Sequence, residues 1–233
     1  MRTAERLTAL ARVELLRGLS AAAIEALAAD CRWREYDTGA AIIGQDDPDR
    51  DVYFVASGRV RVTFIAQNGR EIAFRDLGEG ASFGELSAID GRMRSASVVA
   101  LASTVLASVT REQFWLLLRA HASMTENLLK QLAKLIRDLT ERVVDYSTLG
   151  VQNRIQAELV RMAREAGVSQ NQAILAPIPR HADIASRVST NREAVARELS
   201  QLARQGLIER HHDALVIHDV AQLLEMVDKV RGQ

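Results

Sequence analysis

The chain has 233 residues and equal numbers of acidic and basic side chains, so its formal net charge is zero at pH 7. This balance shows no basic excess for nucleic acid and no acidic excess typical of disorder. No apolar run approaches the about 20 residues that cross a bilayer, and the first residues lack the apolar core of a signal peptide. The single cysteine, Cys31, excludes an internal disulfide and is expected to be buried. We therefore expect a cytoplasmic protein of one large or two ordinary domains.

The first half of the chain predicts one helix followed by many short strands. Residues 19–31 place apolar side chains at helical spacing after Ser20, a suitable N-cap. From Trp33 to Thr110, turn pairs such as Asn68-Gly69 separate short β-rich runs. The runs are 52–55, 60–65, 71–74, 97–101 and 105–109. Turn signals at such regular intervals predict an antiparallel barrel or double-sheet jelly roll.

Histidine placement argues against a metal-dependent enzyme. Jelly rolls in such enzymes bind metals through clustered histidines, but the segment from Trp33 to Thr110 contains none. The pair His211-His212 lies far from this segment, and adjacent residues of a strand point to opposite faces. We therefore expect no metal site, no catalytic residue and a solvated turn around the histidine pair.

A segment late in the predicted barrel, residues 82–98, combines groups that suit a sugar phosphate. Gly84 permits a close backbone approach, and Glu85 can accept a hydrogen bond from a sugar hydroxyl. A short helical turn from Leu86 would offer free N–H groups to an anion. Arg94 supplies a planar fork for phosphate oxygens, and the hydroxyl of Ser95 follows it. The alternative is a strand–turn–strand with an ordinary surface ion pair, because short motifs also match by accident.

The full string resembles the phosphate-binding cassette of cyclic-nucleotide-binding domains, in which Phe-Gly-Glu-Leu is followed after a spacer by Arg-Ser-Ala. The resemblance implies that Glu85 binds the ribose 2′-hydroxyl and Arg94 the cyclic phosphate, with Gly84, Leu86 and Ser95 also in place. It implies a cyclic nucleotide as effector, cAMP or cGMP. Met93 departs from the proline of many members.

After Thr110 the chain is predicted to be helical, with a short helix at 111–119 and a long one at 123–149. The long helix carries apolar residues at alternating intervals of three and four, namely Leu129, Leu132, Ile136, Leu139, Val143 and Tyr146. This heptad seam predicts a homodimeric coiled coil. The alternative is a single amphipathic helix packed on its own domain. A second row, Leu128 and Leu135, could rest on the barrel.

Two further features of the long helix bear on function. Thr140 lies next to the seam and offers a hydroxyl to a ligand base. Gly150 follows the helix, and we expect it to adopt the positive backbone angle of a C-terminal cap and to act as the hinge between domains.

The last third of the chain predicts a helix-turn-helix at 181–188 and 191–205, capped by Asn191 or by Thr190 with Glu193. Its other elements are a helix at 151–166, an extended segment at 173–179, wing strands at 207–210 and 214–217, and a closing helix at 220–230. This order is that of a winged helix-turn-helix domain.

One face of the second helix carries Arg192, Glu193 and Arg197, while its other face is apolar. Arginine fits the O6/N7 edge of guanine, and glutamate can accept from the amino group of cytosine. We therefore predict base contacts from these three residues. The remaining members of the predicted DNA-binding set are Asn191 at the helix start and the phosphate-contacting His181, Arg187 and Arg204. The alternative is a solvated polar face on a helical bundle.

This segment resembles the winged helix-turn-helix of the cyclic AMP receptor and fumarate–nitrate regulator family of bacterial transcription factors. Asn191-Arg-Glu-Ala-Val-Ala-Arg197 is similar to that family's Ser/Thr-Arg-Glu-Thr-Val-x-Arg. The resemblance implies that Arg192, Glu193 and Arg197 read a TGTGA-type half-site of double-stranded DNA. It also implies a homodimer and RNA polymerase as a partner.

The sequence departs from the family pattern at several positions. Arg180 replaces a threonine cap, and Leu139-Thr140 replaces the Thr-Ser pair that contacts the base in cyclic AMP receptors. Leu139 and Thr140 are therefore the predicted base contacts, with one hydroxyl instead of two. Cys31 alone cannot hold the cluster of the fumarate–nitrate branch, and His121 is expected at the surface rather than at a haem.

Taken together, these patterns predict an α+β protein. The predicted domains are an antiparallel β jelly-roll cyclic-nucleotide-binding domain at 1–122, a dimerisation helix and hinge at 123–150, and a winged helix-turn-helix domain at 151–233. The predicted function is an allosteric transcription regulator responsive to a cyclic nucleotide, with cAMP as first choice. The alternatives are a cGMP-responsive or effector-independent regulator of the same family, or a signalling module that does not bind DNA.

Overall fold

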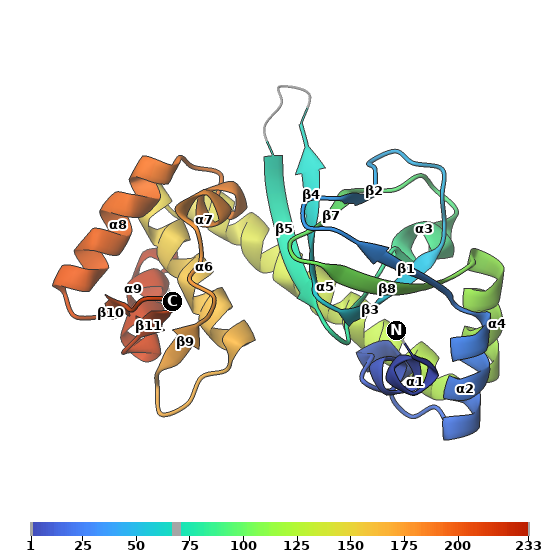
Figure 1. Cartoon of the computed structure of the whole chain (residues 1–233). Helices are drawn as coiled ribbons and strands as arrows, with labels where there is room; N and C mark the ends of the chain where they lie inside the picture. The colour runs from blue at the N-terminus through green and yellow to red at the C-terminus, as the bar shows by residue number, and fades with distance from the viewer. Residues whose placement is uncertain (1, 67–70, 233) are drawn as a thin grey trace. The chain divides into compact units, whose positions relative to one another are not determined.

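A computed structural model describes residues 2–66 and 71–232, so the predicted turn at Asn68-Gly69 lies outside the described residues (Figure 1). The chain divides into two compact units, Met1–Leu135 and Ile136–Gln233. The division falls inside the long helix α5 (Ala122–Thr148), whose last turns therefore belong with the C-terminal unit by their contacts. The predicted domain boundaries near residues 122 and 150 stay predictions.

The N-terminal unit is an antiparallel double sheet with helices, as predicted. Among the described residues, one sheet has the strand order β1-β8-β3-β6 and the other the order β2-β7-β4-β5. The strands are β1 (Arg32–Tyr36), β2 (Ala41–Ile43), β3 (Val52–Ser57), β4 (Arg59–Ile65), β5 (Glu71–Gly78), β6 (Ser82–Phe83), β7 (Ser97–Ala100) and β8 (Thr104–Val109). The helices are α1 (Thr3–Ala11), the 3-10 helix η1 (Glu14–Leu16), α2 (Ala21–Asp30), α3 (Glu85–Asp90), α4 (Arg111–Ala120) and the start of α5.

Two apolar clusters hold this unit together. The cluster between the sheets includes Val60, Phe83 and Leu106, because alternate strand residues point inward. The second cluster packs α1, α2, α4 and α5 onto the outer face of β3. Ser20 caps α2 by accepting a hydrogen bond from the Ala23 amide at 3.2 Å, as predicted. Cys31 is buried, as predicted, and burial raises the pKa of its thiol to about 12.

The C-terminal unit follows the predicted order of a winged helix-turn-helix. Its helices are the end of α5, α6 (Val151–Ala166), α7 (His181–Arg187), α8 (Arg192–Arg204) and α9 (Val220–Arg231). Its strands β9 (Ala173–Leu175), β10 (Ile208–Arg210) and β11 (Leu215–Ile217) form an antiparallel sheet in the order β10-β11-β9. Side chains from α6 to α9 and from this sheet meet in one apolar core.

Helix ends in this unit confirm one prediction and correct another. Of the two candidate caps for α8, the side chain of Asn191 takes the role, accepting from the Ala194 amide at 2.8 Å. The predicted positive backbone angle at Gly150 is wrong, because its φ is −66° and it is the N-cap of α6. Only two residues separate α5 from α6, and the extended Gly150 already starts the next helix.

The predicted heptad seam of α5 is mostly exposed in the single chain. Leu129, Ile136 and Val143 are 61%, 64% and 64% exposed. Leu132 instead packs partly against the core, and Leu128 is fully part of it. Exposed apolar residues at this spacing are typical of a coiled-coil face, and the homodimer stays a prediction. Among the described residues, no helix is both long and apolar enough to cross a membrane.

Candidate functional site

The predicted cassette starts with a glycine in a left-handed conformation. Gly84 has φ +88° and is the N-cap of α3, directly after β6. A Cβ atom at this position would lie 2.8 Å from both the Arg94 Nη1 atom and the Asp51 carbonyl oxygen. Both the angle and the space therefore require glycine, which brings the backbone of the cassette against the arginine.

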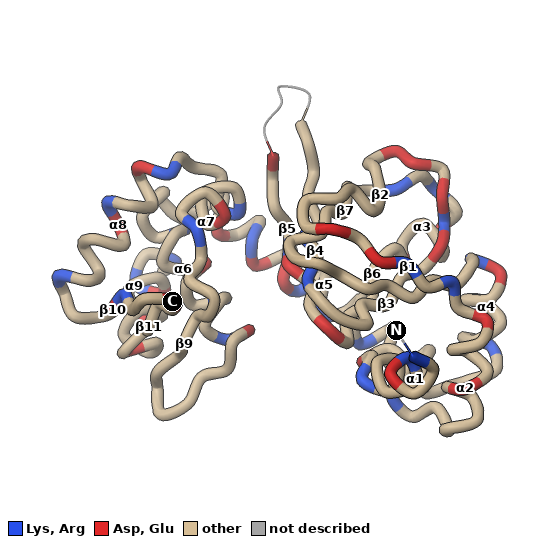
Figure 2. Tube along the Cα trace, viewed as in Figure 1, with Lys and Arg blue, Asp and Glu red and all other residues tan. Residues whose placement is uncertain are grey.

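The guanidinium of Arg94 is buried and anchored from three sides. Its Nη1 donates to the Gly84 carbonyl at 2.9 Å, and its Nη2 donates to Asp49 Oδ2 and the Asp51 carbonyl, both at 2.7 Å. Its backbone amide donates to the Asp47 carbonyl at 3.1 Å. The loop between β2 and β3, whose acidic residues are red in Figure 2, thus fixes the position of Arg94. Only 2% of its side chain is exposed.

One nitrogen of this guanidinium has no partner within the described part of the chain. The Arg94 Nε atom is buried and has no hydrogen-bond partner among the described residues. Arginine has five N–H donors, and the three anchoring bonds use only Nη1 and Nη2. An unsatisfied buried donor costs roughly 1–3 kcal/mol, so an acceptor from a ligand would be favourable here. A phosphate oxygen is the acceptor that the guanidinium fork matches best.

Asp49 is a member of this site that the sequence prediction missed. Burial opposes ionisation of its carboxyl, but hydrogen bonds from Arg94 and the Asp51 amide outweigh burial and lower the pKa. Tyr53 also donates to Asp49 Oδ2 at 3.1 Å and stacks on Phe83. Asp49 is therefore ionised at neutral pH and holds Arg94 in place. The sequence did contain a signal for this role, because four of the six residues at 46–51 are aspartates in a chain with no acidic excess.

Glu85 is the first residue of α3 and is only 8% exposed. Its Oε1 atom lies 3.7 Å from Nη2 of Arg75, which belongs to β5. Glu85 and Arg94 are thus both buried and pair with different residues, so the alternative of a surface ion pair between them is wrong. Leu86 and Ser95 are exposed next to them. The structure brings the five predicted cassette residues into one region.

Two side chains of α4 hold α3 in place through hydrogen bonds. The Ala88 carbonyl accepts hydrogen bonds from Arg111 Nε at 2.8 Å and from Trp115 Nε1 at 3.0 Å. Two donors on one carbonyl fix the short helix that carries Glu85. These two positioning contacts lie outside the cassette motif and were not predicted.

The predicted base contacts, Leu139 and Thr140, lie in the C-terminal unit. Thr140 is exposed, and its hydroxyl donates to the Ile136 carbonyl at 2.9 Å. Leu139 is exposed as well. Their contact with a ligand stays a prediction.

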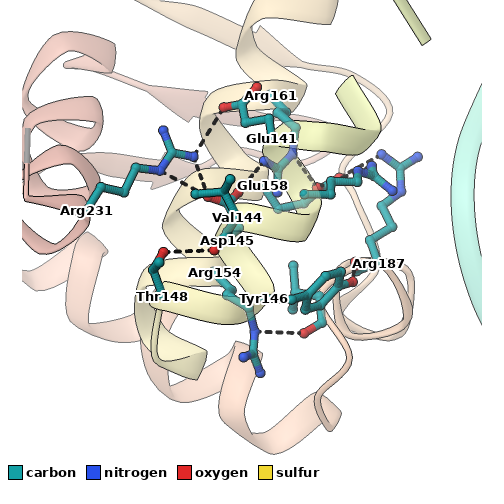
Figure 3. A network of polar contacts seen from close by, with 12 residues as sticks. Glu141, Val144, Asp145, Tyr146, Thr148, Arg154, Glu158, Arg161, Arg187 and Arg231 are labelled. Carbon is teal, nitrogen blue, oxygen red and sulfur yellow. Dashed lines mark hydrogen bonds and ion pairs between the residues drawn. The ribbon is translucent and has the colours of Figure 1, made fainter. Parts of the chain in front are cut away.

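A buried ionic network joins the end of α5 to α6, α7 and α9 (Figure 3). Arg161 donates to Asp145 at 2.7 Å and to Glu158 at 3.0 Å. Glu158 also accepts from Arg187 at 3.0 Å, and Asp145 accepts from Arg231 at 3.0 Å. This cluster, the α5 network, fixes the last turns of α5 within the C-terminal unit.

The α5 network corrects the predicted role of Arg187. This residue was expected at a DNA phosphate, but it is only 5% exposed and its guanidinium points to Glu158. The carbonyl of Arg187 also accepts from the Tyr146 hydroxyl at 2.6 Å. Arg187 therefore belongs to the interior of the unit and not to a DNA surface.

The other predicted DNA contacts lie at the surface. Arg192, Glu193 and Arg197 are exposed on α8, and Asn191 is exposed at its start. On the opposite face, Val195 and Leu202 are buried. His181 is partly exposed at the first position of α7, and Arg204 is exposed in the last turn of α8. This polar face is the arrangement expected of a recognition helix.

The histidine pair occupies the predicted turn. His211 and His212 are exposed between β10 and β11. Within residues 2–66 and 71–232, no group of three or more metal-binding side chains is gathered in one place. His121, expected at the surface, is partly exposed and is the C-cap of α4.

Comparisons with known proteins match both units. A model of the cyclic nucleotide-binding domain matches residues 33–121, and a model of the Crp-like helix-turn-helix domain matches residues 153–226. A cyclic AMP receptor protein of Thermus thermophilus is 30% identical over 214 residues, which are 91% of this chain and 95% of that protein.

Solved structures show the same fold. A CooA mutant from Carboxydothermus hydrogenoformans matches with a TM-score of 0.78 at 22% identity, covering 92% of this chain and 94% of that one. The c-di-GMP responsive global regulator CLP of Xanthomonas campestris matches with a TM-score of 0.69 at 24% identity, covering 85% and 99%.

The two domain models follow each other in the order of the two predicted motifs, and the Thermus relative spans nearly the whole chain. The matched proteins are regulators of transcription and not enzymes. The chain therefore belongs to the cyclic AMP receptor and fumarate–nitrate regulator family, as a cyclic-nucleotide-binding transcription regulator.

Proposed function

We propose that this protein is a homodimer that binds cAMP at Arg94 and Glu85 and then recognises a TGTGA-like palindrome. The observation that carries the proposal is the buried Arg94 Nε atom, which has no acceptor among the described residues although the rest of the guanidinium is anchored. A cyclic phosphate supplies that acceptor.

Each cassette residue has a role in this proposal. Arg94 and Ser95 bind the phosphate, and the backbone of Gly84 and Leu86 lines its approach. Glu85 accepts a hydrogen bond from the ribose 2′-hydroxyl. The Thr140 hydroxyl, next to Leu139, donates its hydrogen to the Ile136 carbonyl, so its oxygen accepts a hydrogen bond from the amino group of the base.

Dimerisation follows from the exposed face of α5. Leu129, Ile136 and Val143 are exposed apolar residues at heptad spacing, and the same face on a second copy would cover them. A dimer is also what a palindromic DNA site requires, because half-sites one helical turn apart place two recognition helices about 34 Å apart.

The ligand acts by shifting a two-state equilibrium. A nucleotide that contacts both the cassette and α5 binds more tightly to the arrangement that allows both contacts. The α5 network then carries the position of α5 into α6 and α9. In the DNA-bound arrangement, Arg192, Glu193 and Arg197 read bases, and Asn191, His181 and Arg204 contact phosphates. The protein acts in the cytoplasm, together with RNA polymerase.

A second effector remains a candidate, since the matched regulator CLP is described as c-di-GMP responsive. The single hydroxyl at Leu139-Thr140 also leaves the purine preference open. A cGMP-responsive or effector-independent regulator is therefore the second candidate. A module that does not bind DNA is disfavoured by the matched helix-turn-helix model.

The proposal is tested by calorimetry with cAMP and cGMP, followed by gel shifts on TGTGA-type sites with and without nucleotide. We expect heat with cAMP, a change in DNA binding on adding it, and loss of the heat in Arg94→Leu. Arg92→Leu is the matched control, because Arg92 is two residues away and exposed. Absence of heat with both nucleotides would refute the cassette assignment, and binding of cGMP alone would refute cAMP as effector.

A further inference from the structure

Arg75 lies beside the carboxylate proposed to bind the ribose. It is on β5, and its Nη2 atom is 3.7 Å from Glu85 Oε1. The Arg75 side chain is 34% exposed and that of Glu85 is 10% exposed. A partly exposed cation therefore pairs with a nearly buried carboxylate. Arg75 is outside the cassette motif, and the function proposed above gives it no role.

The carboxylate next to Arg75 in sequence, Asp76, has its own arginine partner. Asp76 follows Arg75 on β5 and is held by Arg61 through a bidentate pair at 2.7 and 2.9 Å. Successive strand residues point to opposite faces of a sheet. The charge of Asp76 is therefore balanced on one face, and Arg75 balances Glu85 on the other.

The distance between the two groups defines what Arg75 can do. The 3.7 Å between the Arg75 Nη2 and Glu85 Oε1 atoms is an ion-pair distance. It is longer than the roughly 2.7–3.2 Å of an N–H···O hydrogen bond. A carboxylate has about four acceptor sites, so Arg75 balances the charge of Glu85 without occupying the sites that a hydroxyl needs.

We propose that Arg75 is a positioning residue for ribose recognition, which orients Glu85 so that the carboxylate accepts the 2′-hydroxyl of the cyclic nucleotide. This inference rests on the proposed function. Arg75 acts through Glu85, so its contribution exists only for ligands that carry the 2′-hydroxyl. A residue that merely stabilised the β-roll would affect all cyclic nucleotides alike.

The test compares cAMP with 2′-deoxy-cAMP, which differs only by that hydroxyl, using the full-length protein and calorimetry. Because only cAMP can donate the 2′-hydroxyl to the Glu85 carboxylate, the wild type should bind cAMP roughly 10- to 100-fold more tightly than 2′-deoxy-cAMP. In Arg75→Gln we expect cAMP to bind about tenfold more weakly while 2′-deoxy-cAMP changes less than about twofold. Arg75→Lys, which keeps the positive charge, should recover most of the preference for cAMP.

Arg59→Gln is the matched control, because Arg59 is an exposed arginine on the adjacent strand β4. It should leave both affinities unchanged. An equal loss for both nucleotides in Arg75→Gln, or an unchanged preference for cAMP, would overturn the role of Arg75. Wild-type protein that binds neither nucleotide would instead refute the proposed function itself. If Arg75→Gln does not fold, as judged by its thermal unfolding, Arg75→Met, which removes the charge but keeps the length of the side chain, makes the same comparison.

Discussion

The two units each bury charged side chains, but the surroundings of Arg94 and of Glu158 differ. Arg94 has three anchoring hydrogen bonds and one buried donor without a partner among the described residues. Glu158, by contrast, faces three arginines, which are Arg142, Arg161 and Arg187. We propose a ligand anion at the first site, whereas the second has its cationic partners within the protein.

The difference indicates how burial serves function in one unit and structure in the other. Burying ions costs several kcal/mol unless partners compensate, so an acceptor that a ligand supplies to the Arg94 Nε donor would stabilise this site. In the described parts of the chain, the arginines of the α5 network face the carboxylates Glu141, Asp145, Glu158 and Asp228. This network fixes the last turns of α5 through residues of the C-terminal unit alone.

The largest effect is expected from breaking the α5 network with Glu158→Ala. Removing one partner of a buried ion cluster costs about 3–5 kcal/mol, because the arginines around Glu158 lose their common acceptor. Urea unfolding followed by far-UV circular dichroism should show this loss. Both tryptophans, Trp33 and Trp115, lie in the N-terminal unit, so the unfolding transition seen by fluorescence should not move.

The control for this variant is Glu225→Ala. Glu225 forms an exposed pair with Lys229 one helical turn away, and such pairs contribute about 0.5 kcal/mol or less. Equal destabilisation by the two substitutions would contradict the structural role of the α5 network.

Acid should weaken the same network reversibly. Burial raises the pKa of Glu158, but the charges of Arg142, Arg161 and Arg187 outweigh burial and hold the pKa below its ordinary value of 4.5. A carboxyl with a lowered pKa adds stability above pH 4.5 that is lost as pH falls through the folded-state pKa. The protection of amides in α6 and α9 against exchange, relative to the intrinsic rate at each pH, should therefore fall below that pH.

Glu158→Gln removes this titration and should flatten the pH dependence of exchange in the C-terminal unit. The N-terminal unit keeps its own dependence on acid, because Asp49 also has a lowered pKa. An unchanged pH profile in Glu158→Gln would show that other groups control the acid response.

In the N-terminal unit, Arg94→Lys separates charge from geometry. Lysine keeps the positive charge but is a point charge that cannot reach three anchoring acceptors and a phosphate at once. We expect cAMP affinity to fall by about 1.5–3 kcal/mol, measured by calorimetry, with the circular dichroism transition of the C-terminal unit unchanged. Arg92→Lys should bind like the wild type, and a similar loss there would indicate a general effect of surface charge.

The sequence predicts well those features that depend on neighbouring residues. Ser20 and Asn191 cap helices as predicted, and the cassette and α8 lie where their motifs indicated. The strands β1, β2 and β6 were missed, since β1 has no clear alternation and β2 and β6 have only three and two residues. Short or irregular strands are defined by their pairing partners, which are distant in sequence.

Contacts between distant residues explain the errors in the site. Arg187 looks like a solvent-facing helix residue until Glu158, 29 positions earlier, is brought against it. Asp49 and Arg94 are 45 positions apart, so no local pattern links them. Arg75 beside Glu85 is the same kind of contact. Sequence motifs therefore identified the groups proposed to touch a ligand but not the groups that hold them.

The smallest effect is expected from loosening α3 with Trp115→Phe. Phenylalanine keeps an aromatic ring but lacks the pyrrole ring and its Nε1 donor to the Ala88 carbonyl, so the N-terminal unit should lose about 0.5–1.5 kcal/mol for the hydrogen bond, in addition to the contacts of the removed atoms. Because α3 carries Glu85, cAMP affinity should fall as well, by about twofold. Trp33→Phe is the matched control, since Trp33 Nε1 donates to the Ala28 carbonyl in α2, which carries no cassette residue. It should cost similar stability and leave cAMP affinity unchanged. Equal weakening of cAMP binding by both variants would contradict a specific role of the α3–α4 hydrogen bonds in the ligand site. These bonds would then contribute only to the stability of the unit, like any other buried hydrogen bond.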